Sequence, residues 1–410
     1  MQIIDCKLNS MKKKNSNWIK FRHKFFTAIL RYPVQLAVFL LFKFRPCKVK
    51  LNKNENAFII SNHQSDIDPI LIGLSVNKPI YFVGTDTLFN KSFVSKLLNY
   101  VFAPIPKKKG LSDPKCIKSM FKIAKEKGNI GLFVEGNRTY AEFQYYIDTS
   151  ICKLIKSLKM PLILLNINGG NGIFPRFSNK RRKGKFYTSL AKRIEVDEYM
   201  NMDDQTLLDI IKESIKVYDS ENNFEYKSKK RAEYLERMLF VCPKCKQVET
   251  LYSKGEFVYC KKCDLKVEYT TKLHLKSEDK SFKFDRLIDW YEYQKKWCRE
   301  FSYDDDNQVI FKDNLIELYV TKIGEKRKLI CKGDLTLSAS KLLFNGKQFD
   351  LKDISIASVI GGRKFNFTTS EGDYLVIGHK KFNPLKYVMM FNRLDTHMKE
   401  KQTDKYYTIN

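Results

Sequence analysis

The sequence is poor in the residues that form flexible linkers and in acidic residues. It contains 18 Gly and 11 Pro among 410 residues, which leaves little room for long linkers. Hydrophobic residues make up 43% of the chain, which excludes a disordered or collagen-like protein. Lys and Arg outnumber Asp and Glu by 75 to 46, so the net charge is +29. This excess predicts a polyanionic partner: a nucleic acid, an anionic membrane or a phosphorylated substrate.

The positive charge is concentrated toward the start of the chain. Residues 1–60 contain 13 Lys and Arg, with only Asp5 and Glu55 as acids, whereas residues 271–410 carry a net charge of only +6. The polyanion is therefore expected to meet the first two-thirds of the chain.

The sequence also lacks two features that are typical of secreted proteins, a signal peptide and a disulfide framework. The polar, basic first residues show no cleavable signal peptide, and no disulfide framework is evident. Six of the ten cysteines are scattered through the chain: Cys6, Cys47, Cys116, Cys152, Cys298 and Cys331. Both observations predict a reducing, cytosolic environment.

The N-terminal segment, 1–55, has no uninterrupted apolar run long enough to cross a bilayer. Its longest uncharged stretch is 32–42, Arg31 and Pro33 interrupt the apolar region, and a bilayer needs roughly 20 apolar residues. Lys and Arg flank the stretch on both sides, which favours a short helix lying in one leaflet of a membrane. The alternative is a helix that packs on the core of a soluble domain.

Residues 56–240 are predicted to form an α/β domain with a mainly parallel sheet. Short apolar runs alternate with helix-like segments. Residues 203–240 are predicted to be mostly helical and are rich in charged residues. The predicted strands are 57–61, 79–84, 130–134, 162–167 and 185–190, and the predicted helices are 66–76, 115–127 and 149–158.

The first candidate catalytic motif is Asn62-His63-Gln64-Ser65-Asp66-Ile67-Asp68-Pro69, directly after a predicted strand. A helix starting near Ser65 or Asp66 puts Asp68 in its first turn, where the carboxylate can reach His63. Such a pair provides a general base and a group that orients it, and the nucleophile can be a substrate hydroxyl. A histidine after a strand can equally be structural.

Two more motifs follow predicted strands. In Phe133-Val134-Glu135-Gly136-Asn137-Arg138-Thr139, Gly136 permits a tight turn and Arg138 can bind a phosphate through two hydrogen bonds. The third motif is 165–170 followed by Phe-Pro-Arg at 174–176. Ligand sites of open α/β sheets form at strand ends, so the three motifs are expected to meet.

In this order and spacing, the three motifs resemble the glycerolipid acyltransferases, specifically the 1-acylglycerol-3-phosphate acyltransferase group, over about residues 17–215. The resemblance implies transfer of a fatty acyl group from a thioester to a lysophospholipid hydroxyl at a membrane surface. It implies that His63 is the base with Asp68 as its partner, and that Glu135, Gly136 and Arg138 bind the acceptor phosphate.

Four positions depart from the family pattern. Val134 stands where the family usually has Pro, and Asn137 where it has Thr. A family lysine falls on Thr85, and a later basic position, usually Arg, falls on Lys107. The run Lys107–Lys109 can restore positive charge without the fork geometry of Arg, or it can be a solvated loop.

Cys242, Cys245, Cys260 and Cys263 form two CxxC pairs separated by fourteen residues. Four thiolates at this spacing predict a zinc ribbon at 241–270 with a complete, structural zinc site. Two redox or packing pairs are the alternative. The ribbon is too small to bury a core, so zinc is expected to supply much of its folding free energy.

The rest of the chain lies outside the resemblance. Residues 271–305 are predicted to be an amphipathic helical connector, with the helix at about 284–301. Residues 306–410 contain many short strand-like runs and a final helix at about 384–399, which predicts a small β-rich domain. Strand count and the last helix make this domain loosely similar to pleckstrin-homology-like or GRAM domains.

The sequence thus predicts an acyltransferase at the cytoplasmic face of a membrane, monotopic or peripheral, with acyl-CoA or acyl-carrier protein as donor. The expected acceptor is 1-acylglycerol-3-phosphate, and another lysophospholipid is the close alternative. A zinc-ribbon nucleic-acid-binding protein is the competing class, but it leaves three motifs without a role, so no nucleic acid is expected. A lipid-binding scaffold with a degenerate site is a third possibility, which the presence of His63, Asp68, Glu135 and Arg138 disfavours.

Overall fold

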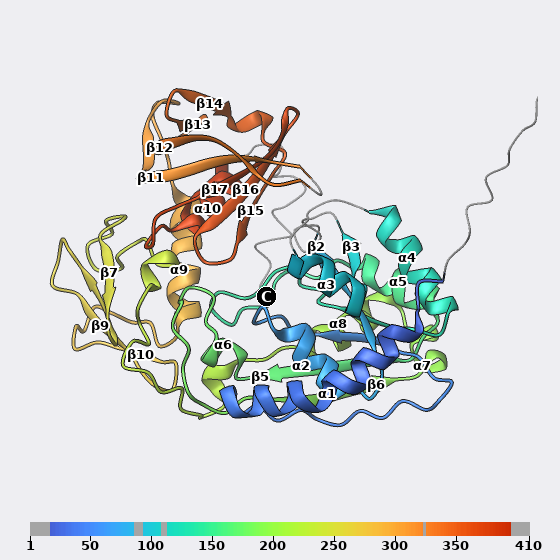
Figure 1. Ribbon diagram of the computed structural model, residues 1–410. Helices are drawn as coiled ribbons and strands as arrows, with labels where there is room; N and C mark the ends of the chain where they lie inside the picture. Colours follow the sequence, from blue (N-terminus) through green and yellow to red (C-terminus); the bar gives the residue numbers. More distant parts are fainter. Residues whose placement is uncertain (1–16, 86–92, 108–112, 323–324, 395–410) are drawn as a thin grey trace, which may run out of the picture.

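The structure is a computed structural model that describes residues 17–85, 93–107, 113–322 and 325–394. These residues form three sheets, which belong to an α/β domain, a small ribbon and a β-rich C-terminal domain (Figure 1). The predicted α/β fold class is confirmed, as is the β-rich character of the C-terminal part.

The sheet of the α/β domain has six strands in the order β3-β2-β4-β1-β5-β6. All neighbouring pairs are parallel except β5 with β6, so the sheet is mainly parallel, as predicted. The strands are β1 Phe58–Ser61, β2 Ile80–Thr85, β3 Ile105–Lys107, β4 Asn129–Leu132, β5 Leu162–Asn168 and β6 Tyr187–Ile194. The sequence pattern did not predict β3, which has only three residues.

Helices cover both faces of this sheet, as the continuous apolar strands require. Ile59 of β1 packs in the core that contains Leu71 and Ile72 of α2, while Phe58 and Ile60 pack with α4, α5 and α8 on the other face. The helices of the domain are α2 Asp68–Ser75, α3 Phe93–Phe102, α4 Pro114–Lys125, α5 Ser150–Leu158, α6 Gly170–Ile173, α7 Val196–Met200 and α8 Asp204–Ser214.

The N-terminal helix α1, Phe21–Phe42, is longer than predicted. Arg31 does not interrupt it, because its guanidinium donates to the carbonyl oxygens of Gly73, Leu74 and Val76 at the end of α2. Pro33 also lies inside the helix. With 22 residues, α1 is the one helix among those described that is long and apolar enough to cross a membrane by length and composition. The expectation of a short helix was therefore wrong.

The prediction of a mostly helical segment at 203–240 was wrong after α8. Residues 215–240 contain only the 3₁₀ turns Asp219–Glu221 and Leu235–Arg237. Both arginines of this charged segment, Arg231 and Arg237, are buried. Arg231 donates to the carbonyl oxygen of Tyr269, and Arg237 donates to that of Phe177.

The ribbon is a four-stranded antiparallel sheet in the order β10-β9-β8-β7. Its strands are β7 Leu251–Lys254, β8 Phe257–Cys260, β9 Lys266–Tyr269 and β10 Leu275–Lys276. The predicted connector helix follows as α9, Leu287–Glu300. Trp290 of α9 donates its indole N–H to the carbonyl oxygen of Val241, which anchors the ribbon at its base.

The C-terminal domain is a seven-stranded antiparallel sheet in the order β14-β13-β12-β11-β17-β16-β15. Its strands are β11 Val309–Thr321, β12 Lys328–Ser338, β13 Lys341–Phe344, β14 Lys347–Asp350, β15 Ile356–Ile360, β16 Lys364–Thr369 and β17 Gly372–Ile377. Helix α10, Pro384–Leu394, packs on β15 and β16 and against α9. The predicted continuation of this helix to 399 lies outside the described residues.

Candidate active site

The structure brings His63 and Asp68 together at the end of β1. His63 follows the last strand residue, Ser61, by two positions, and Asp68 is the first residue of α2. The His63 Nδ1 atom lies 2.8 Å from Oδ2 of Asp68. This contact places the Nδ1 proton on the side of the carboxylate, so Nε2 is the nitrogen left to accept a proton from a substrate.

Asp68 is held rigidly for this role. Its side chain is fully buried, and Oδ2 also accepts hydrogen bonds from the backbone N–H groups of Gln64 at 2.6 Å and Ser65 at 2.9 Å. The hydroxyl of Ser65 donates to Oδ1. Because four donors, including the imidazole, satisfy the buried carboxylate, its position is fixed before any substrate binds.

The imidazole of His63 lies against an aromatic wall. It stacks on Phe133 with ring centroids 4.4 Å apart, and Phe133 stacks in turn on Phe82. The His63 side chain is still 21% exposed, so a ligand can reach it. A purely structural histidine does not need this combination of a fixed tautomer, a flat support and an accessible edge.

Glu135 joins the first two motifs. Its Oε1 accepts from the backbone N–H of His63 and its Oε2 from that of Tyr145, both at 3.3 Å. Burial raises the pKa of Glu135 to about 8, and the nearby charge of Asp68 adds to the increase. The backbone N–H of Thr139 also donates to the carbonyl oxygen of His63. In this geometry Glu135 positions the loop that carries His63.

Arg138 lies on the same loop as Glu135, beyond a turn at Gly136. Gly136 has φ +65°, a backbone conformation that favours glycine, and no atom of the described residues lies within 4 Å of where a Cβ would sit. The guanidinium of Arg138 pairs with Asp66 at 2.8 Å, and Asp66 is 83% exposed. The first two motifs therefore place a cation, Arg138, at the rim of the site that contains His63.

The third motif supports the first through hydrogen bonds that the sequence pattern did not predict. The side chain of Asn62 donates to the carbonyl oxygen of Ile167 and accepts from its N–H, at 2.9 and 2.8 Å. Gln64 accepts from the N–H of Asn171. Amide side chains next to a candidate catalytic histidine were the only signal in the sequence that could have indicated these contacts.

Lys107 lies at some distance from the His63–Asp68 pair. It is the last residue of β3 and is exposed, at the same edge of the sheet as the ends of β1 and β4. The order β3-β2-β4-β1 puts it three strands from β1, or about 14 Å in the plane of the sheet. Lys108 and Lys109 lie outside the described residues.

The four cysteines of the ribbon converge, as predicted. Their Sγ atoms all lie within 4.8 Å of one another, and the pairs Cys242–Cys263 and Cys245–Cys260 are 3.7 Å apart. Thiolates 2.3 Å from a tetrahedral zinc ion have Sγ atoms about 3.8 Å apart, so the donor set and its size fit zinc. The backbone N–H of Lys262 donates to Cys260 Sγ, as is typical of a thiolate ligand.

Comparisons with known proteins bear on the α/β domain. The family model described as Acyltransferase matches residues 47–167. A search of curated proteins found no match to this sequence. Among solved structures, the 1-acyl-sn-glycerophosphate (LPA) acyltransferase PlsC from Thermotoga maritima is similar over 47% of this chain and 78% of that chain, with 16% identity and a TM-score of 0.39. His63, Asp68, Glu135 and Arg138 all lie inside the range that the Acyltransferase model matches.

Proposed function

We propose that this protein transfers a fatty acyl group from acyl-CoA or acyl-carrier protein to the free hydroxyl of 1-acylglycerol-3-phosphate, giving phosphatidate. The observation that carries the proposal is the His63–Asp68 pair, with a buried carboxylate fixed by hydrogen bonds and an accessible imidazole edge. It is supported by the match of 47–167 to the acyltransferase family model.

The proposed reaction needs no covalent enzyme intermediate. Nε2 of His63 removes the proton from the acceptor hydroxyl as its oxygen attacks the thioester carbonyl carbon. The C–S bond then breaks, the ester forms, and the leaving thiolate takes the proton from the His63 imidazolium, which gives the free thiol and the neutral imidazole. Asp68 orients the imidazole and stabilises the imidazolium that forms in this step.

Arg138 is the proposed phosphate-binding residue. Its guanidinium lies at the rim of the site, and a phosphate can replace the exposed carboxylate of Asp66 as its partner. Gly136 allows the turn that presents Arg138, and Glu135 holds the backbone of the loop. Lys107, at the end of β3, is proposed to contribute a longer-range positive charge to the acceptor site.

We infer that α1 associates with an anionic membrane surface on its cytoplasmic side. Eight of its large apolar side chains are exposed: Phe21, Phe25, Ile29, Tyr32, Leu36, Phe39, Leu40 and Leu41. Lys and Arg at both ends complement anionic head groups, so the helix can lie in one leaflet. Such placement brings a lysophospholipid acceptor to the site without its leaving the membrane.

The four cysteines are proposed to hold one structural zinc ion. Cys242, Cys245, Cys260 and Cys263 supply a complete tetrahedral set, which leaves no position for a substrate. In Figure 1 the ribbon lies at one end of the molecule, beside the C-terminal domain and away from α4 and α5. The proposed role of the metal is therefore stability of the ribbon.

Incubation of the purified protein with a panel of lysophospholipids and both thioester donors, read by mass spectrometry, tests this function. Formation of a diacyl product with 1-acylglycerol-3-phosphate supports the proposal. A product only with another lysophospholipid would replace the acceptor and keep the reaction class. The absence of any acyl product, with a folded protein in vesicles, would overturn it.

A further inference from the structure

The C-terminal β-rich domain contacts the loop that carries Arg138. The turn between β15 and β16 lies on residues 176 and 177, at the end of the third motif. A Cβ added to Gly362 in this turn would lie 2.9 Å from the carbonyl oxygen of Arg176. We call the boundary between the α/β domain and the C-terminal domain the seam. The close approach of the two backbones shows that the seam is tightly packed.

Arg176 bridges the two domains at this point. It is 6% exposed, and its guanidinium donates to three backbone carbonyl oxygens. One acceptor is that of Arg138, and the other two are those of Val359 at 3.0 Å and Gly361 at 3.3 Å in the C-terminal domain. A planar, always charged fork is suited to such a bridge, because its donors have fixed directions.

Tyr140 strengthens the same bridge. Its ring lies 4.1 Å from the guanidinium of Arg176, and its buried hydroxyl donates to the carbonyl oxygen of Gly361 at 3.1 Å. Tyr140 follows Arg138 by two residues, so the loop is held on both sides of Thr139.

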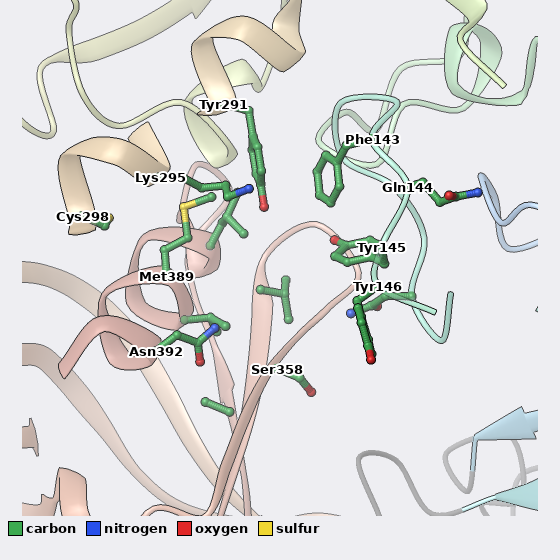
Figure 2. Close-up of a pocket in the computed structure, with 15 residues that line it drawn as sticks. Phe143, Gln144, Tyr145, Tyr146, Tyr291, Lys295, Cys298, Ser358, Met389 and Asn392 are labelled. Carbon is green, nitrogen blue, oxygen red and sulfur yellow. The ribbon is translucent and has the colours of Figure 1, made fainter. Parts of the chain in front are cut away.

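The seam also contains a small cavity beside this loop. Its volume is about 80 Å³, and its lining includes Asn137, next to Arg138, and Ser358 of β15. Figure 2 shows Phe143, Tyr145 and Tyr146, from the segment after Arg138, facing α9, α10 and β15 across this cavity. Asn137 and residues 143–146 thus line a cavity whose other side is formed by α9, α10 and β15.

We propose that Arg176 is a positioning residue, through which the C-terminal domain sets the place of Arg138 and so the affinity for the phosphate of the acceptor. The inference rests on the proposed function, because it assigns the acceptor phosphate to Arg138. On this proposal, binding of the acceptor depends on residues 356–364 of the C-terminal domain, which lie far outside the range matched by the family model.

The test compares Arg176→Gln with Arg237→Gln in steady-state kinetics. Arg237 is a matched control: it is also a buried arginine of the seam, but it donates to Phe177, Asn179 and Lys380 and not to the Arg138 loop. For Arg176→Gln we expect the KM for 1-acylglycerol-3-phosphate to rise about ten- to a hundredfold, as loss of hydrogen bonds from a charged donor implies. The KM for the thioester and kcat should change much less.

Two additional variants separate positioning from general stability. Arg176→Lys keeps the charge but not the fork, so it should not restore the KM. Tyr140→Phe removes only the hydrogen bond to Gly361 and should raise the same KM by a smaller factor. Arg237→Gln should lower thermal stability and leave the KM unchanged.

An unchanged acceptor KM in folded Arg176→Gln protein, or an equal rise in Arg237→Gln, would overturn the inference. If the wild-type protein acylates 1-acylglycerol-3-phosphate, either result counts against the positioning role alone. If the wild-type protein is inactive with every acceptor, the proposed function itself fails.

Discussion

Asp66 and Arg138 form an ion pair that joins the loop after β1 to the loop after β4, with 2.8 Å between Oδ2 and the guanidinium. The carboxylate is 83% exposed and the guanidinium only 18%. The pair therefore holds the cation at the rim of the candidate site, where an incoming anion must compete with Asp66.

Replacing Asp66 by Asn should therefore improve acceptor binding. The change frees Arg138 and removes a negative charge that repels a phosphate. An exposed ion pair contributes about 0.2–1 kcal/mol, so the KM for 1-acylglycerol-3-phosphate should fall by up to about fivefold. The control is Asp304→Asn, which removes an exposed charge in a turn before β11. A higher KM in Asp66→Asn would show that Asp66 itself contacts the substrate.

Glu135 should make stability depend on pH. Its pKa is raised to about 8 by burial, above the ordinary value of 4.5, so the folded state binds the proton more tightly than the unfolded state. The stabilisation is complete below about pH 4.5 and is lost as pH rises through about 8. Glu135→Gln cannot titrate, so its thermal unfolding temperature should fall less between pH 5 and pH 8.

The quantity to compare is the difference in thermal unfolding temperature between wild type and Glu135→Gln at each pH. Burial also raises the pKa of Asp219, to about 7, but this group is common to both proteins and cancels in the difference. Parallel curves for wild type and Glu135→Gln would contradict the raised pKa. The glutamine cannot accept both backbone hydrogen bonds, so a constant loss of stability is expected in addition.

The ribbon should contain about one equivalent of zinc, measured by elemental analysis of reduced protein. Joint replacement of Cys242 and Cys245 by Ser should abolish zinc binding and unfold the ribbon, lowering the yield or the thermal stability. Cys298→Ser, at a cysteine outside the cluster, is the control. The folded fraction of the double variant should still turn over. Immediate loss of activity on chelation, with unchanged circular dichroism, would place the metal at the active site instead.

The exposed face of α1 should determine membrane binding. Leu36 and Leu40 are 58% and 61% exposed, and their joint replacement by Gln should weaken binding to anionic vesicles at least about tenfold, given the free energy of burying two leucines. Val309 and Leu329, two exposed residues of the C-terminal domain, provide a control pair. High salt should weaken wild-type binding only in part, because apolar insertion is not screened. Complete release by salt would argue against insertion of α1.

Local patterns in the sequence predicted the parts of the structure that depend on local rules. The strand ends, the His63–Asp68 pair and the convergence of the four cysteines follow from periodicity, a helix start and ligand spacing. Arg31 and the segment 215–240 were misjudged for one physical reason. Their charged side chains are satisfied by backbone carbonyls of distant segments, and no local pattern contains those partners.

The same limit applies to the candidate site. The residues of the motifs could be predicted, but Asn62 binding to Ile167 and Arg176 binding across the seam depend on tertiary packing. The contacts of Glu135 depend on tertiary packing too, because its carboxylate accepts backbone hydrogen bonds from His63 and Tyr145.

The central claim is that His63 acts as a general base oriented by Asp68, and the most direct test is the rate of acyl transfer by His63→Ala. We expect kcat/KM to fall about 10²–10⁴-fold, the usual contribution of general acid–base catalysis, with thermal stability and vesicle binding close to wild type. Asp68→Asn should lose less, because it leaves the imidazole in place. Retention of more than about a hundredth of the wild-type rate by folded His63→Ala protein would contradict the account.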